Sequence, residues 1–212
     1  MTRWAVIVAV KPLRVAKSRL VLPEALRRDL VVAMLVDTLT AAAAVSGLGL
    51  LVITDDTRIA TVAAAEGVSV RGGEPAGGLN AALSYGEGLA RSFWGGARIA
   101  ALPGDLPWLI SGDLAAALTD ASECERALVV DADHQGTTLL CAASDLRPSY
   151  GMGSAIRHVT SGCVPLNGHW PGLRRDVDTL ANLIEVPGTA LGTHTAALIG
   201  SLPLGSVHAR NS

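Results

Sequence analysis

Short runs of apolar, often β-branched residues alternate along the chain with longer stretches rich in alanine and leucine. The short runs predict strands at residues 4–10, 48–54, 68–70, 98–102, 127–131 and 137–142. The longer stretches predict helices at residues 23–45, 57–66, 79–91 and 111–119. Strands that alternate with helices are typical of βαβ units, so the pattern predicts an α/β fold around a mostly parallel sheet.

The part of the chain from residue 151 to 178 is rich in Gly, His, Arg and Asp and has little periodicity. Long loop-like segments in a compact domain are often functional. One more short helix is expected at residues 179–184, and a frayed tail from about residue 205. Neither a repeat nor a linker interrupts the pattern, which predicts a single domain over residues 1–212 with a core at about 4–200.

Half of the 212 residues are hydrophobic, and the formal net charge is −2. The chain therefore has no global basic field that would attract nucleic acid. The three cysteines are widely spaced and form no C-x-x-C pair, which argues against a disulfide framework or a zinc site and indicates a reducing compartment. The first apolar run is interrupted at Lys11 and predicts a strand rather than a signal peptide, and no stretch predicts a membrane span. We expect a cytoplasmic protein.

Polar clusters follow several predicted strands, and ligands of open parallel sheets bind at these carboxyl ends. The two lysines of the chain, Lys11 and Lys17, both lie in the loop after the first strand, together with Arg14 and Arg19. The ammonium group of lysine is a mobile point charge, and the guanidinium group of arginine can form two parallel hydrogen bonds, so both side chains suit phosphate binding. The alternative is a solvated loop with ordinary surface charge.

Two acidic segments suit a metal ion. Asp105 lies in a Pro-Gly-Asp-Leu-Pro turn directly after a strand, and Asp176 and Asp178 form a D-x-D pair whose carboxylates share one side of an extended chain. Three carboxylates can hold Mg²⁺ against a triphosphate. The alternative is that Asp105 closes a turn and Asp178 caps the next helix. The flanking Arg174 and Arg175 are expected to pair with these carboxylates or to contact phosphate.

Small polar residues predict an anion site in the later part of the chain. Gly151 and Ser154 lie in a glycine loop that opens a short helix, and Thr137 offers a similar donor; ordinary turns are the alternative. His158 and His169 could contact a ligand or serve as structural hydrogen-bonding groups. Dinucleotide, P-loop, serine hydrolase and zinc peptidase motifs are absent from the sequence. Candidate phosphate and metal sites, without an obvious protein nucleophile, indicate an enzyme that transfers a group directly onto or between phosphates.

The ordered segments V-A-V-K-P-L, A-K-S-R-L, M-L-V-D-T-L, L-V-I-T-D-D, G-L-N-A-A-L, L-P-G-D-L-P and R-R-D-V-D-T resemble the CofC-type guanylyltransferases of coenzyme F-420 biosynthesis, over residues 6–183. The actinobacterial form is the most similar. The resemblance implies a single-domain, three-layer α/β/α nucleotidyltransferase fold, Rossmann-like and similar to that of molybdenum-cofactor guanylyltransferases, with a mostly parallel mixed sheet. Those enzymes carry a glycine-rich first loop, which this chain replaces with Lys11-Pro12-Leu13-Arg14.

The resemblance also implies transfer of GMP from GTP to phosphoenolpyruvate, with release of pyrophosphate. It assigns GTP phosphate binding to Lys11, Lys17 and Arg19, catalysis to Lys17, Arg19 and Asp105, and a position near the base or ribose to Asn80. By the same resemblance, Thr137, Gly151 and Ser154 bind the acceptor, and Asp105, Asp176 and Asp178 bind Mg²⁺ or, in its place, Mn²⁺.

Partners are then small molecules, with a transient hand-off to the downstream transferase of the pathway and no nucleic acid or membrane. The sequence leaves open 2-phospho-L-lactate or 3-phosphoglycerate as the acceptor, a different cofactor nucleotidyltransferase, and a catalytically silent nucleotide-binding subunit.

Overall fold

The central strand β1 (Trp4–Ala9) directs alternate side chains into two apolar layers. Val6 and Val8 belong to one buried cluster, and Ala5 and Ile7 belong to the other. This alternation is the period of two that any strand imposes on its side chains. Because both faces of β1 are apolar, helices must cover both sides of the sheet.

The computed structural model describes residues 3–17, 19–73, 75–183 and 190–201. In this part of the chain, seven strands form one sheet in the order β3-β2-β1-β4-β6-β5-β7. The strands after β1 are β2 (Leu48–Ile53), β3 (Ser69–Arg71), β4 (Arg98–Ala101), β5 (Arg126–Val130), β6 (Thr137–Ala142) and β7 (Val164–Pro165). The helices are α1 (Glu24–Ala43), α2 (Thr57–Ala65), α3 (Leu79–Phe93), α4 (Ser111–Ala121), α5 (Ser154–Thr160), the 3-10 helix η1 (Leu180–Leu183) and α6 (Thr193–Gly200).

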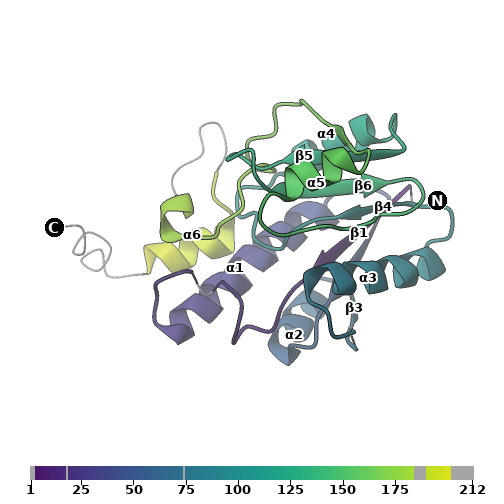
Figure 1. Ribbon diagram of the computed structural model, residues 1–212. Coiled ribbons are helices and arrows are strands. Elements are labelled where there is room, and N and C mark those ends of the chain that lie inside the picture. Colours follow the sequence, from purple (N-terminus) through teal and green to yellow (C-terminus); the bar gives the residue numbers. More distant parts are fainter. Residues whose placement is uncertain (1–2, 18, 74, 184–189, 202–212) are drawn as a thin grey trace.

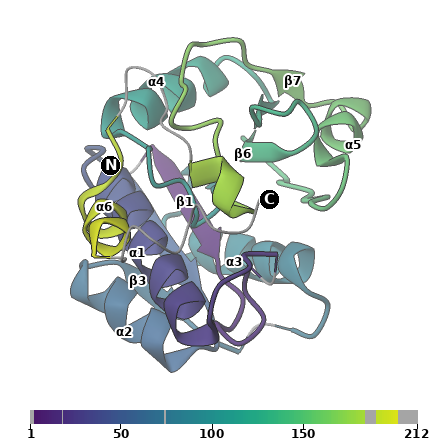
Figure 2. The same cartoon turned by 90° about the vertical axis from the view of Figure 1, so that its left-hand side faces the viewer.

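Helices lie on both faces of this sheet (Figures 1 and 2). The cluster around Val6 and Val8 includes Leu35 of α1 and Leu114 of α4. The cluster around Ala5 and Ile7 includes Leu83 of α3. The predicted three-layer α/β/α fold is therefore confirmed.

The sheet is mixed, with one strand reversed. β1 pairs in parallel with β2 and β4, β2 with β3, and β5 with β7, whereas β6 runs antiparallel to β4 and β5. The predicted strands and the four longer predicted helices end within about two residues of the observed ones, as expected of strongly patterned segments.

Two elements were not predicted. The edge strand β7 has only two residues, and α6 has no local cap. The first amides of α6, from His194 and Thr195, donate instead to the carboxylate of Asp37 on α1, at 3.0 and 2.8 Å. A cap that comes from another helix leaves no signal in the local sequence. The expected helix at residues 179–184 is observed as η1, and its last residue lies outside the described part, as does the tail from residue 205.

No helix of the described segments is both long enough and apolar enough to cross a membrane. Cys124, Cys141 and Cys163 are free thiols in this structure.

Candidate active site

The loop after β1 is folded back on itself by local hydrogen bonds. The amides of Val15 and Ala16 both donate to the carbonyl of Pro12, at 2.9 and 3.1 Å. The apolar side chains of Leu13 and Ala16 are buried, which leaves Lys11 and Arg14 exposed. The loop therefore presents these two cations outward from an apolar anchor, at the carboxyl end of the central strand.

Lys17 in this loop has a φ of 50°, in the left-handed region that residues other than glycine rarely adopt. Its side chain is mostly buried, with 17% exposed. Arg19, two residues later, is exposed. Strained backbone of this kind is often found where a side chain must be aimed at a functional site.

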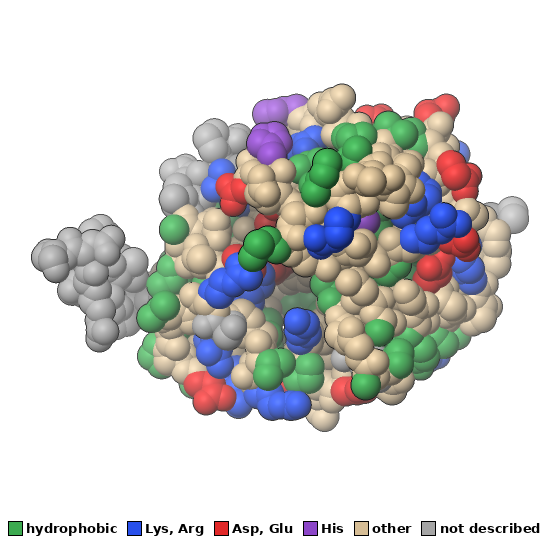
Figure 3. All heavy atoms as spheres, viewed as in Figure 1, with side chains coloured by type: hydrophobic (Ala, Val, Ile, Leu, Met, Phe, Trp, Pro, Cys, Tyr) green, Lys and Arg blue, Asp and Glu red, His purple; other side chains and the backbone are tan. Residues whose placement is uncertain are grey.

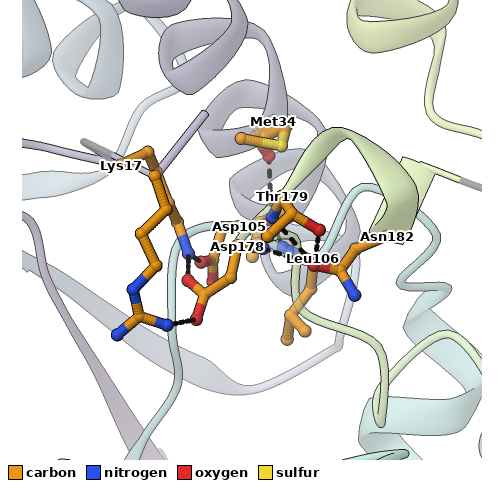
Figure 4. Close-up of polar contacts among 9 residues, drawn as sticks. Lys17, Met34, Asp105, Leu106, Asp178, Thr179 and Asn182 are labelled. Atoms are coloured by element: carbon orange, nitrogen blue, oxygen red, sulfur yellow. Dashed lines mark hydrogen bonds and ion pairs between the residues drawn. The ribbon is translucent and has the colours of Figure 1, made fainter. Parts of the chain in front are cut away.

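Asp105 follows β4 in a turn that packs tightly against α1. A side chain at Gly104 would place its Cβ 2.8 Å from Cδ1 of Leu35, so any larger residue there would force the Leu35 side chain to shift. The next amide, from Leu106, donates to Oγ1 of Thr38 on α1 at 3.0 Å, and Thr38 in turn donates to the carbonyl of Met34 at 2.8 Å (Figure 4). These contacts fix the backbone of the turn that carries Asp105.

Asp176 and Asp178 are placed beside Asp105 by the residue between them. Val177 is fully buried, and its amide donates to the carbonyl of Asp105 at 3.2 Å. With Val177 directed into the core, the flanking carboxylates lie on the opposite side, as the D-x-D spacing predicted. One oxygen from each of Asp105, Asp176 and Asp178 lies within 4.8 Å of the others.

Lys17 joins two of the three carboxylates. Its Nζ atom contacts Oδ2 of Asp105 and lies 2.6 Å from Oδ1 of Asp178, and Arg19 Nη1 lies 3.2 Å from Oδ2 of Asp178 (Figure 4). Among the described residues, no amide of η1 donates to the Asp178 carboxylate, so the alternative role of Asp178 as a helix cap is not observed. Oδ1 of Asn182, within η1, accepts from the amides of Asp178 and Thr179, which precede the helix, at 3.2 and 2.8 Å.

The charges of this cluster are unbalanced. Burial alone would lower the pKa of Lys17, but the carboxylates of Asp105 and Asp178 outweigh it and hold the pKa above its ordinary value. Burial also favours the neutral form of Asp178, yet the hydrogen bond and charge of Lys17, with Arg19, lower its pKa. Burial and the neighbouring Asp105, offset in part by Lys17, raise the pKa of Asp176 to about 7. The three carboxylates thus carry more negative charge than the ammonium group of Lys17 can balance.

This donor set fits a divalent cation. Oδ1 of Asp105 is buried and has no hydrogen-bond partner among the described residues, although buried polar atoms are usually satisfied. Carboxylate oxygens are the ligands that Mg²⁺ prefers, and three of them converge here. A divalent ion would give the unpaired oxygen a partner and would balance the excess negative charge.

Thr137, Gly151 and Ser154 come together on the other half of the sheet. Oγ of Ser154, at the start of α5, donates to Oγ1 of Thr137, at the start of β6, over 3.3 Å. The amide of Ser154 donates to the carbonyl of Gly151 at 3.0 Å, and Gly151 has a φ of 131°, which favours glycine. The three residues form one cluster, and its role as the acceptor site stays a prediction.

Backbone contacts tie this cluster to the acidic one. Asp131 shapes the turn before Thr137, because its carboxylate accepts from the amides of Gln135 and Gly136 at 2.9 and 2.6 Å. In the same turn, the amide of Ala132 donates at 2.7 Å to the carbonyl of Arg174, two residues before Asp176.

Arg174 has a different role from the one expected. Its guanidinium donates to the carbonyls of Val130, Leu166 and Gly168 at 2.8, 2.9 and 3.1 Å. It also lies over the ring of Trp170. Arg174 thus braces the loop before the D-x-D pair, and it forms no ion pair with those carboxylates in the described part of the chain.

A surface cavity of about 700 Å³ lies between the first loop and the ends of β2 and β3. It is lined by Pro12, Arg14, Val15, Asp55, Asp56, Thr57, Arg58, Pro75, Ala76, Gly77 and Gly78. Figure 3 shows a hollow near the middle of the face that it draws, with Lys and Arg side chains at its rim. Asp56 connects two of its walls, since its carboxylate accepts from the amide of Leu13 at 2.8 Å and caps α2 through Arg58 at 3.0 Å.

The residues that line this cavity after β2 and β3, among them Asp55, Asp56, Gly77 and Gly78, were not among the site residues predicted from the sequence. The sequence signal that could have identified them is their position at the carboxyl ends of adjacent parallel strands.

Asn80 lies in the first turn of α3. Its Oδ1 accepts from the amide of Tyr150 at 2.7 Å, and its Nδ2 donates to the carbonyl of the same residue at 3.2 Å. A contact between Asn80 and a nucleotide stays a prediction.

Comparisons with known proteins agree with this arrangement. The family model described as "Guanylyl transferase CofC like" matches residues 4–163. Phosphoenolpyruvate guanylyltransferases of Geodermatophilus obscurus, Salinispora arenicola and Streptomyces coelicolor are 46%, 42% and 39% identical to the chain. The matches cover 93%, 93% and 94% of this chain and 94%, 94% and 97% of the relatives.

Solved structures with low sequence identity share the fold. A CMP:2-keto-3-deoxy-manno-octonic acid synthetase complexed with CTP has a TM-score of 0.57 at 13% identity, covering 85% of this chain and 95% of its own. A cytidylyltransferase from Leptospira borgpetersenii has a TM-score of 0.55 at 13% identity, covering 86% and 84%. A manganese complex of a Mycobacterium tuberculosis protein has a TM-score of 0.51 at 20% identity, covering 95% and 100%. Similarity at this level supports the fold alone.

Proposed function

The chain belongs to the family of CofC-like guanylyl transferases, and we propose that it transfers GMP from GTP to the phosphate of phosphoenolpyruvate. The family membership rests on a model that matches most of the chain and on relatives with up to 46% identity, which are named phosphoenolpyruvate guanylyltransferases. The observation that carries the proposal for this chain is the convergence of Asp105, Asp176 and Asp178 around Lys17 at the carboxyl ends of the strands.

We assign the guanosine part of GTP to the cavity beside the first loop. Its volume of about 700 Å³ is in the range of small-ligand sites, and the backbone of Gly77 and Gly78 allows a flat ring to approach closely. The triphosphate would then extend along the first loop toward Lys17 and Arg19, with Lys11 as an outer contact. This placement brings the cations to the phosphates and leaves the three carboxylates for the metal.

We assign the acceptor to the cluster of Thr137, Gly151 and Ser154. Phosphoenolpyruvate carries a phosphate and a carboxylate, which accept hydrogen bonds from hydroxyl and amide donors. The two hydroxyls are preorganised by their mutual contact of 3.3 Å. Backbone contacts between the Thr137 turn and the segment of Asp176 connect this cluster to the proposed metal ligands.

In the reaction, an oxygen of the acceptor phosphate attacks the α-phosphorus of GTP. The bond from that phosphorus to the bridging oxygen breaks, and pyrophosphate leaves. A phosphate monoester has a second pKa of about 6, so the nucleophile is largely ionised at neutral pH and needs no protein base. Catalysis then consists of positioning and electrostatic stabilisation.

Lys17 and Arg19 would stabilise the charge that develops on the departing pyrophosphate. Because Lys17 is bound by Asp105 and Asp178, its use on phosphate requires an exchange of partners. Mg²⁺, or Mn²⁺ in its place, would be held by Asp105, Asp176 and Asp178 and would supply charge neutralisation at the reacting phosphates.

The test is pyrophosphate release by the purified protein with GTP, Mg²⁺ and each candidate acceptor in turn. Phosphoenolpyruvate is expected to support release, with kcat/KM at least about tenfold above those of 2-phospho-L-lactate and 3-phosphoglycerate. Replacing GTP by ATP or CTP is the control for the base. A second assay adds the downstream transferase of the pathway with its deazaflavin substrate, which traps the product. The same assay tests the transient hand-off of this product between the two proteins, which we propose to occur in the cytoplasm. Release that does not depend on phosphoenolpyruvate would rule out the proposed acceptor.

A further inference from the structure

His158 is a fully buried residue of α5 whose two ring nitrogens are both engaged. Nε2 lies 2.9 Å from the amide nitrogen of Ser149, and Nδ1 lies 2.9 Å from Oγ1 of Thr137. A backbone amide can only donate, so Nε2 must be the acceptor. A neutral imidazole has one acceptor and one donor nitrogen; the proton is therefore on Nδ1 and is donated to Thr137.

The surroundings of His158 keep the ring neutral. Burial, with the nearby guanidinium groups of Arg126 and Arg157, lowers the pKa of His158 to about 4. The ring also packs edge-to-face against Tyr150, with the ring centroids 5.3 Å apart. A second proton would have to be placed on Nε2, against the amide of Ser149. The tautomer is thus determined by the backbone rather than by solvent.

The position of this proton determines which hydrogen bonds the hydroxyl of Thr137 can form. A hydroxyl has two lone pairs and one proton. Oγ1 of Thr137 accepts from His158 and, at 3.3 Å, from Ser154. With both lone pairs used, its own proton is available for donation to another group.

We propose that His158 is a positioning residue of the acceptor site, which holds Thr137 as a hydrogen-bond donor toward an anionic oxygen of the phosphoacid. The inference rests on the proposed function, because it takes Thr137 and Ser154 as acceptor-binding residues. It adds a residue that does not itself touch the substrate and that acts through the orientation of one hydroxyl group. A ligand with a carboxylate or phosphate oxygen is favoured at Thr137, since such oxygens only accept.

Two substitutions separate this role from a purely structural one. In His158→Asn, the amide nitrogen can take the place of Nδ1 and still donate to Thr137, whereas in His158→Gln the side-chain oxygen can replace Nε2 and accept from Ser149. We expect His158→Gln to raise KM for phosphoenolpyruvate about tenfold and His158→Asn less than about threefold. KM for GTP should stay within about twofold in both variants, because the contacts at issue are in the acceptor site.

His194→Gln is the matched control. This histidine is exposed on α6, and its side chain can change without affecting the hydrogen bond from its backbone amide to Asp37. An equal rise in KM for the acceptor in His158→Asn and His158→Gln would overturn the proposal. So would a rise in both Michaelis constants together, because that pattern indicates a general loss of structure.

A double-mutant cycle tests whether His158 acts through Thr137. Thr137→Val removes the donor, and adding His158→Gln to it should change KM for phosphoenolpyruvate by less than about twofold more. Independent effects that multiply in the double variant would contradict the proposal.

The tautomer can be measured without turnover. A long-range ¹H–¹⁵N correlation spectrum of the intact protein, with His158 assigned from the signal lost in His158→Asn, should show a protonated Nδ1 and an unprotonated Nε2. A proton on Nε2 would overturn the inference. Since this spectrum needs no substrate, it remains informative even if guanylyl transfer to every phosphoacid fails, and the two failures are therefore distinguishable.

Discussion

The Nζ atom of Lys17 lies 2.6 Å from Oδ1 of Asp178, although 161 residues separate the two in the chain. The same ammonium group contacts Asp105, so one cation joins the loop after β1 to the carboxylates of two later segments. Below the ordinary pKa of lysine this stabilisation is fully present, because the folded-state pKa of Lys17 is raised; it is lost only as the pH rises through that higher value.

Replacing Lys17 by Met should destabilise the metal-free protein. Asp105, Asp176 and Asp178 would then face one another with only the exposed Arg19 as a neighbouring cation, which is costly for partly buried carboxylates. We expect the Tm without metal to fall by more than about 4 °C, and added Mg²⁺ to raise the Tm of the variant more than that of the wild type. Turnover should fall about a hundredfold even when metal is saturating, because the charge on the leaving pyrophosphate loses its partner.

Arg147→Met serves as the control, because Arg147 and Asp145 form an ion pair in which both side chains are mostly exposed. Such pairs contribute little, so its Tm should change by less than about 2 °C. Equal Tm values for Lys17→Met and the wild type would contradict the role of Lys17 in the cluster.

Asp105→Asn should remove most of the activity. The substitution leaves the turn its shape but takes away a negative oxygen from the proposed metal ligands, and kcat should fall at least about a hundredfold. Chelation with EDTA should likewise stop pyrophosphate release in the wild type, and Mg²⁺ should restore it. Near-normal turnover of Asp105→Asn with saturating Mg²⁺ would show that the metal assignment is wrong; Asp145→Asn on the surface is the matched control.

His158 should make stability depend on pH below neutrality. Its pKa is about 4 in the folded protein and about 6.5 in an unfolded chain. Between these values the unfolded state binds more protons, so the free energy of unfolding decreases as the pH falls from about 6.5 to about 4 and shows no further change from this group below that. Above about pH 6.5 the contribution is complete.

The measurement is the urea midpoint of the wild type and of His158→Asn at about pH 7.5 and about pH 5. The advantage of the wild type over the variant should shrink at the lower pH. An advantage that is the same at both values would mean that His158 is not held neutral.

Asn80→Ala should act on the acceptor. Both polar atoms of the Asn80 side chain are bound to the backbone of Tyr150, in the segment that leads to Gly151. Its removal should loosen this segment and raise KM for phosphoenolpyruvate about five- to tenfold, with a smaller effect on KM for GTP. The reverse pattern, with KM for GTP raised alone, would instead support the position near the base or ribose that the family resemblance implies.

Ala76→Trp should block the nucleotide. Ala76 is exposed and lines the cavity of about 700 Å³, so an indole ring there fills space that we assign to guanosine. KM for GTP should rise more than about tenfold, while KM for phosphoenolpyruvate and the Tm stay close to those of the wild type. Ala65→Trp, at the exposed end of α2, is the matched control. Unchanged GTP binding in Ala76→Trp would place the base elsewhere.

Much of the fold could be predicted from local pattern. β1 is a continuous apolar run, typical of a strand that is buried on both faces, and α1 is a 20-residue stretch rich in alanine and leucine that begins directly after Pro23. β7 and α6 could not be predicted, since two residues carry no period and the amides of α6 are capped by Asp37 from a distant helix. Such elements depend on contacts that do not exist until the chain has folded.

By itself, the sequence identified the candidate residues for the chemistry: two lysines in one loop, an aspartate after β4, and a D-x-D pair near the end of the fold. Alternating strands and helices also determined that these residues come to one edge of a sheet. Only the tertiary structure decided how they are paired. It directed Arg174 to backbone carbonyls, Asn80 to Tyr150, Lys17 to Asp105 and Asp178, and His158 to Thr137. Side-chain partners depend on packing between segments far apart in the chain, and no local pattern specifies that packing.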